Sequence, residues 1–136
     1  MPEKQELTLP SRIESVEEAA AIAESFARGL GFGDDFISAI DLAVRESVAN
    51  AVKHGNKFDA EKPVEVSFLG SKDRFEVTVR DFGTGFSVDE IPDPTDPQNL
   101  LKVSGRGILF MRSFMDEVEW KNHESGGVVV KMLKKQ

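Results

Sequence analysis

One stretch is the most informative part of this chain: Glu46-Ser-Val-Ala-Asn50-Ala-Val-Lys53-His54-Gly55-Asn56. It closes a segment from about residue 34 in which apolar residues recur every three or four positions, a period typical of a helix with one buried face. Glycine at position 55 is expected to end that helix. Glu46 and Asn50 are four residues apart, so they share a helix face, and Lys53 and His54 lie one further turn along it.

This pair of side chains suits phosphate chemistry. The amide oxygen of Asn50 is a hard ligand for Mg²⁺, which usually takes one or two protein oxygens and fills its shell with phosphates and water. The carboxylate of Glu46 could accept a proton from a hydroxyl or a water that attacks the γ-phosphate. Taken alone, the pair is explained more often by a solvated polar helix face, so the chemistry needs support from elsewhere in the chain.

A second motif stands where an apolar strand ends. After Pro63 the apolar period changes to two, and residues 64–68 and 75–79 form a predicted hairpin. The motif that follows is Asp81-Phe-Gly83-Thr-Gly85-Phe86. Glycines two apart let a flat ligand approach the backbone, and an aspartate there could accept a hydrogen bond from the adenine 6-amino group. The alternative is a tight turn whose aspartate bonds its own backbone.

A third motif ends a long segment without periodicity. Three prolines interrupt residues 82–105, and a loop of this length in a compact domain is typical of a functional lid. It ends in Ser104-Gly105-Arg106-Gly107, where glycines can act as a hinge and Arg106 and backbone N–H groups suit phosphate. A flexible junction with a surface arginine explains the same residues, and the lysine of a P-loop is missing.

The remaining elements complete a fold prediction. We expect a strand at residues 5–9, a helix opened by a capping box at Ser15-Val-Glu-Glu18 and ended by Gly29 or Gly31, a short helix over 107–114, and strands near 117–121 and 128–133 joined by a turn at Gly126-Gly127. The order predicts an α+β fold: a two-layer sandwich in which helices cover one face of a mainly antiparallel mixed sheet.

Composition narrows the class of protein. A length of 136 residues suits one domain over residues 1–136, and the net charge of -7 argues against direct binding to nucleic acid. The chain has no cysteine and only two histidines, too few for a histidine-based metal site. It shows no signal peptide and no run of about 20 apolar residues, so we expect a cytoplasmic protein without a membrane partner.

Together the three motifs resemble the N-box, G1-box and G2-box of the histidine-kinase-like (Bergerat, or GHKL) ATPases over nearly the whole chain. The likeness is strongest to the bacterial anti-sigma-factor serine kinases. It is carried by the stretch from Glu46 to Asn56 quoted above and by Gly105-Arg-Gly-Ile-Leu-Phe-Met-Arg-Ser-Phe-Met-Asp-Glu117-Val118.

The resemblance implies a role for each matching residue. Glu46 would be the general base that activates a hydroxyl of the protein substrate, and Asn50 would bind Mg²⁺. Asp81 would recognise adenine. The other implied nucleotide contacts are the pocket glycines Gly83 and Gly85, the phosphate-closing Gly105, Arg106 and Gly107, and Lys53 and His54. One position departs from the family: Val128 stands where related chains often carry a threonine near the adenine.

The implied function is that of an ATP- and Mg²⁺-dependent protein serine/threonine kinase that is also an anti-sigma factor. It would phosphorylate an anti-sigma-factor antagonist, sequester a sigma factor and form a homodimer, with a lid at about residues 86–105. Two alternatives stay open. One is a non-catalytic module that uses ATP only to order its lid and partner surface. The other is a detached histidine-kinase ATP-binding domain, although the chain offers no helical hairpin with an acceptor histidine.

Overall fold

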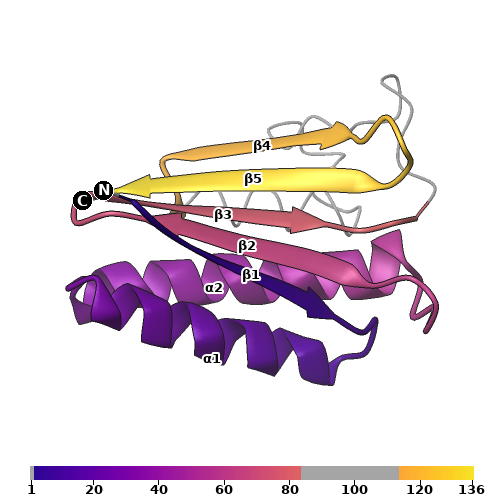
Figure 1. Ribbon diagram of the computed structural model, residues 1–136, viewed down its shortest axis with the longest axis horizontal. Coiled ribbons are helices and arrows are strands. Elements are labelled where there is room, and N and C mark those ends of the chain that lie inside the picture. The colour runs from indigo at the N-terminus through magenta and orange to yellow at the C-terminus, as the bar shows by residue number, and fades with distance from the viewer. Residues whose placement is uncertain (1, 84–113) are drawn as a thin grey trace, which may run out of the picture.

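The computed structural model describes residues 2–83 and 114–136, which form two layers (Figure 1). One layer is a five-stranded sheet and the other holds the two long helices, which cover a single face of that sheet. The predicted α+β sandwich is confirmed. Several predictions lie outside the described residues: the lid at 86–105, the helix at 107–114, and the site residues Gly85, Gly105, Arg106 and Gly107.

The helical layer follows the predicted apolar period. Helix α1 spans Glu14–Gly29 and helix α2 spans Asp34–Asn50. Small residues dominate the buried face of α1, which lets the two helices approach closely, whereas α2 buries larger aliphatic side chains. The buried residues of these faces are Ala19, Ala23 and Ala27 on α1, and Ile37, Ile40, Val44 and Val48 on α2.

The predicted helix from 34 to 54 is confirmed, but its last turn has a different geometry. Residues Ala51–Gly55 form a π-helical turn, η1, in which the N–H of Asn56 donates to the carbonyl of Ala51 at 2.8 Å. Single π-helical turns inside α-helices occur frequently at functional sites. The wider turn changes the direction in which the side chains after Asn50 leave the helix.

The sheet has the strand order β1-β2-β3-β5-β4. Its strands are β1 Glu3–Leu9, β2 Val64–Gly70, β3 Arg74–Arg80, β4 Glu117–Asn122 and β5 Val128–Lys135. All four pairings among these strands are antiparallel, so the described sheet has no parallel pair. Because β5 lies beside β3, with Arg80 opposite Val129, the residues that follow β3 meet those that begin β5.

The core lies between the sheet and the helices. Alternate residues of β2 and β3 face it, and Phe68, Phe75 and Val77 have no exposed surface. Burying a side chain of this size contributes about 1.5–3 kcal/mol through the hydrophobic effect, so these strands hold the two layers together. Among the described residues, no helix combines the length and apolar character needed to cross a bilayer.

One local prediction is wrong. Ser15 does not cap α1: the helix already begins at Glu14, its N-cap position is Ile13, and no side chain caps it. The Ser15 hydroxyl instead donates to the carbonyl of Pro10 at 2.6 Å, so it joins the helix to the segment that follows β1. Acidic residues in the first turn, Glu14 and Glu17, favour the helix N-terminus through its dipole.

Candidate nucleotide-binding site

Asp81 is the buried polar centre of the candidate site. It follows β3 directly and is 6% exposed. Its Oδ1 accepts hydrogen bonds from the backbone N–H of Gly83 at 3.0 Å and of Val128 at 3.2 Å. Its own N–H donates to the carbonyl of Val128 at 3.1 Å. Within the part of the chain that the structure describes, Oδ2 has no hydrogen-bond partner, so one carboxylate oxygen is left for a ligand.

The electrostatics of Asp81 are set mainly by its burial. Burial raises the pKa of Asp81 above the usual 3.8 because the charged form loses hydration. The two backbone N–H groups, and the more distant charges of Arg80 and Lys62, lower the pKa by less. The carboxylate is therefore incompletely compensated by the protein, and an N–H donor on a ligand would stabilise its ionised form.

Three glycines surround Asp81, and each lies where a side chain has no room. A Cβ atom on Gly55 would overlap the carboxylate of Asp81, and one on Gly83 would overlap the carbonyl of Gly55. A Cβ on Gly127 would overlap the carbonyl of Asp81, and the φ of Gly127 is +86°, a conformation that favours glycine. Three chain segments thus meet backbone to backbone around one carboxylate.

Helix α2 brings the predicted catalytic pair to the same end of the molecule. Glu46 and Asn50 both lie on regular α-helix, so their four-residue spacing keeps them on one face, and both are half-buried. Asn50 immediately precedes η1, and Gly55 at the end of η1 packs against the carboxylate of Asp81. Figure 1 shows this end of α2 beside the end of the sheet at which β3 stops.

Lys53 and His54 lie in the π-helical turn and are exposed. No hydrogen bond connects them to Asp81 in the described part of the structure. The structure therefore brings together Gly55, Asp81 and Gly83, places Glu46 and Asn50 on the adjoining helix, and leaves Lys53 and His54 at the surface. Their predicted contact with phosphate stays a prediction, as does every role assigned to Gly85, Gly105, Arg106 and Gly107.

The sequence did not indicate several of the residues that build this site. Gly55 was expected only to end a helix, and Gly127 only to form a turn. Asn56 received no role although it stands in the quoted stretch. The departure at Val128 concerns a side chain, yet the group that reaches Asp81 is the backbone N–H of residue 128, which valine and threonine supply equally. One signal was available: Asn56 follows Gly55, and because a glycine alone is enough to end the helix, the asparagine needs another explanation.

The donor set bears on the predicted magnesium. Across residues 2–83 and 114–136, no three histidine, aspartate or glutamate side chains lie close enough to hold a metal ion. Mg²⁺ does not need such a cluster, because it commonly takes one or two protein oxygens and completes its shell with nucleotide phosphates and water. The residue available for this is Asn50 at the α2–η1 junction.

Residues 9–134 match the family described as the histidine kinase-like ATPase domain. The chain belongs to this family. Similar curated proteins include the serine-protein kinase RsbW of Halalkalibacterium halodurans, 34% identical over 98% of this chain and 83% of that protein. The serine-protein kinase RsbW of Bacillus subtilis is 33% identical over 95% of this chain and 83% of its own length. The anti-sigma F factor of Bacillus thuringiensis is 37% identical over 72% of this chain and 68% of its own.

Solved structures support the fold assignment. The RsbU and RsbW domains of Rv1364c from Mycobacterium tuberculosis superpose with a TM-score of 0.72 at 18% identity. That match covers 98% of this chain and 32% of the other. The catalytic domain of histidine kinase ThkA gives a TM-score of 0.60 at 16% identity, covering 98% and 97%. At these identities the likeness is one of fold. The family is one of ATPases, so ATP binding by an ATP-dependent phosphotransferase is supported at the family level.

Proposed function

We propose that this chain is an ATP- and Mg²⁺-dependent protein serine/threonine kinase and an anti-sigma factor. It phosphorylates an anti-sigma-factor antagonist and sequesters a sigma factor, acting as one domain over residues 1–136. The observation that carries the proposal is the buried carboxylate of Asp81, one oxygen of which accepts no hydrogen bond from residues 2–83 and 114–136, beside the helix that bears Glu46 and Asn50. The names of the relatives, serine-protein kinase RsbW and anti-sigma F factor, support the choice of substrate and partner.

In this proposal Asp81 selects the base. The adenine 6-amino group donates to Oδ2, while Oδ1 keeps its two backbone donors. Gly83 and Gly85 shape the pocket around the ring. The phosphates are held by Lys53, His54, Gly105, Arg106 and Gly107, and Asn50 holds Mg²⁺. When bound, Mg²⁺ supplies positive charge that offsets the charge on the transferring phosphoryl oxygens.

Glu46 is the proposed general base. The hydroxyl oxygen of the substrate serine or threonine forms a bond to Pγ, its proton passes to the Glu46 carboxylate, and the bond from Pγ to the bridging oxygen breaks, so that ADP leaves with the electron pair. The neighbouring cation does not hold Glu46 in an ion pair, because Arg45 bonds Asp41 at 3.0 Å and pairs with Glu17 of α1. Among the described residues, the Glu46 carboxylate, one turn before Asn50, therefore stands outside the ion pairs of Arg45.

The proposal is tested by incubating the protein with labelled ATP and a cognate antagonist. We expect Glu46→Gln to bind ATP as the unmodified protein does and to lose about 10²–10⁴-fold in phosphoryl transfer, the usual contribution of a general base. The matched control is Glu18→Gln, which removes an exposed carboxylate on α1 and should leave transfer unchanged. Good nucleotide binding with no transfer by the unmodified protein would contradict the kinase assignment.

The same experiment separates the alternatives. A module that uses ATP only as a switch would keep its partner regulation in Glu46→Gln. A detached histidine-kinase domain would yield an acid-labile phosphohistidine instead of an acid-stable phosphoserine. The proposal also includes a homodimer, as is usual for anti-sigma kinases of this type, and a monomer in light scattering at micromolar concentration would count against it.

A further inference from the structure

Asn56 connects the backbone beside Asp81 to two other segments of the chain. It is 2% exposed, and its Oδ1 accepts a hydrogen bond from the N–H of Phe82 at 2.7 Å across 26 residues of sequence. Phe82 stands between Asp81 and Gly83, the residue whose N–H donates to the Asp81 carboxylate. The side chain of Asn56 therefore holds the middle one of the three backbone N–H groups of residues 81–83.

The other half of the amide fixes its orientation. Nδ2 lies 2.8 Å from the Ser11 hydroxyl oxygen and 3.0 Å from the carbonyls of both Lys62 and Pro63. Ser11 itself donates to the carbonyl of Lys62. Carbonyl oxygens only accept hydrogen bonds, so the NH₂ group must face them and the amide oxygen must face Phe82. The segments after β1 and before β2 thereby determine where the turn after β3 lies.

The hydrogen bonds of Asn56 do more than end the helix. Gly55 closes the π-helical turn, and the bonds of Asn56 run to segments 45 and 26 residues away along the chain. Phe82 is held from one side by Asn56, while the carboxylate of Asp81 packs against Gly55 on the same loop. A shift of Phe82 would move the Gly83 donor, and the carboxylate would turn with it. Because Gly83 is one of the two donors to Oδ1, the bond between Phe82 and Asn56 helps to fix where Oδ2 lies.

We propose that Asn56 is a positioning residue for recognition of the purine 6-amino group. It fixes the backbone of residues 81–83 so that Asp81 keeps Oδ1 on its two backbone donors and presents Oδ2 to the base. The inference rests on the proposed function, because it takes Asp81 as the adenine acceptor. It assigns to Asn56 a part in selectivity among purine nucleotides that is separable from its part in stability.

The test compares Asn56→Ala with Ser11→Ala. The first removes the bond to Phe82 along with the rest of the network, whereas the second disturbs the same buried network and leaves that bond in place. For each protein, dissociation constants are measured for ATP and for purine riboside triphosphate, which lacks the 6-amino group. We expect both variants to be less stable, but only Asn56→Ala to lose the preference for ATP, by about tenfold, as for a lost hydrogen bond to a charged group.

A double-mutant cycle distinguishes positioning from general damage. In an Asp81→Asn background, Asn56→Ala should change the ratio of the two dissociation constants no further, because both act through one carboxylate. If Asn56→Ala does not fold, Asn56→Ser replaces it, since a serine hydroxyl can still donate to the nearby carbonyls and is too short to span to Phe82.

The outcomes separate this inference from the function on which it rests. An unchanged ratio in the Asn56 variant, or an equal loss in Ser11→Ala, would overturn the positioning role while the proposed function stands. A protein with intact Asn56 and Asp81 that shows no preference for ATP would instead remove adenine recognition by Asp81, and the inference with it.

Discussion

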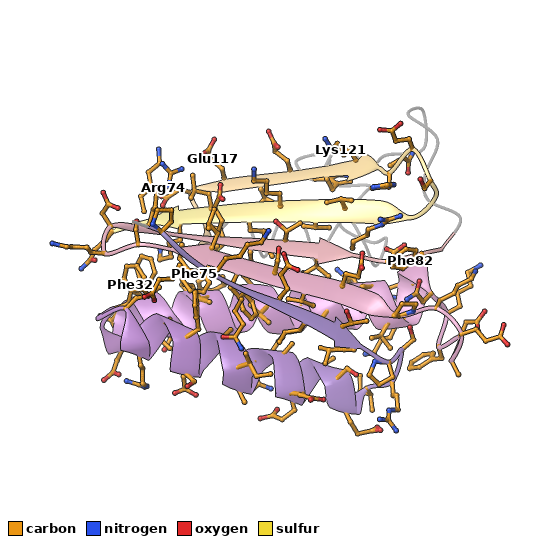
Figure 2. The ribbon with its side chains drawn as sticks, viewed as in Figure 1. Phe32, Arg74, Phe75, Phe82, Glu117 and Lys121 are labelled. Atoms are coloured by element: carbon orange, nitrogen blue, oxygen red, sulfur yellow. The ribbon has the colours of Figure 1, made fainter. Side chains whose placement is uncertain are left out.

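The two ends of this sandwich are built from opposite kinds of residue. At one end phenylalanine rings fill the space between the layers, with centroids from 4.0 to 6.3 Å apart, and these are Phe26, Phe32, Phe36, Phe68 and Phe75. At the other end glycines surround one buried carboxylate, and backbone meets backbone. Figure 2 shows Phe32 and Phe75 at the first end and Phe82 at the second.

Stability and ligand binding depend on different ends of the molecule. Packed aromatic rings remove a large apolar area from water and stabilise the fold without leaving space for a ligand. A buried carboxylate costs stability, as its raised pKa indicates, and among the described residues its Oδ2 accepts no hydrogen bond. Substitutions at the two ends should therefore have separable effects, and each prediction below tests that separation.

The largest effect on stability is expected at the aromatic end. Phe75 has no exposed surface, and its ring contacts those of Phe26, Phe32 and Phe68. We expect Phe75→Ala to lower the free energy of unfolding by about 3–5 kcal/mol, since it removes a large buried side chain and leaves a cavity. Chemical denaturation measures this, and ATP affinity of the folded fraction should stay unchanged. A Phe75→Ala protein that keeps its stability but loses ATP binding would contradict the separation of the two ends.

The next effect is expected at the glycine end and concerns binding. Gly55→Ala places a methyl group where the Asp81 carboxylate lies, so the carboxylate must move. We expect ATP binding to weaken by about 1–3 kcal/mol, the cost of losing a hydrogen bond to a charged group. The matched control is Gly29→Ala at the end of α1, where a Cβ meets nothing within 4 Å. Equal ATP affinities of the two variants in calorimetry would show that the glycines do not shape the site.

The helix and strand positions at both ends could be predicted because they depend on local pattern. The apolar period of α2 placed Glu46 and Asn50 on one face, and Asp81 was expected at a strand end, where it lies. Part of the aromatic end follows from the same pattern, since Phe68 and Phe75 lie on the two strands of the predicted hairpin. The packing of Phe32 and Phe36 was not predicted. Local propensity and burial are properties of neighbours in sequence, so they can be inferred without knowing the fold.

The details of the glycine end could not be predicted because they depend on contacts between distant segments. Asn56 bonds Ser11 and Phe82, and the Val128 N–H reaches Asp81 across 47 residues. Nothing in the sequence near residue 127 indicates that a Cβ there would overlap the carbonyl of Asp81. The capping box failed for a related reason: the segment after β1 folds back so that Ser15 bonds Pro10.

A smaller effect is expected from pH. The pKa of Asp81 is higher in the folded chain than the usual 3.8, so the folded state holds this proton more tightly than the unfolded state. The contribution of Asp81 to stability is thus fully present below the unfolded pKa and is lost as pH rises through the folded pKa. We expect the stability of Asp81→Asn relative to the unmodified protein to be greater at about pH 7 than at about pH 3.5.

Urea denaturation of both proteins at the two pH values checks this expectation. Gly29→Ala, which changes no titrating group, provides the control, and its stability difference should not depend on pH. A relative stability of Asp81→Asn that falls as pH rises would mean that the carboxylate is favourably compensated within the protein, contrary to the burial that raises its pKa.

Recognition of adenine by Asp81 at the glycine end is tested by a nucleotide titration of Asp81→Asn beside the unmodified protein. ATP and purine riboside triphosphate are titrated into each protein, with and without Mg²⁺. We expect that Asp81→Asn binds ATP about 1–3 kcal/mol more weakly, that its affinity for the analogue is unchanged, and that the fold is retained. Equal ATP affinity in the two proteins would contradict it.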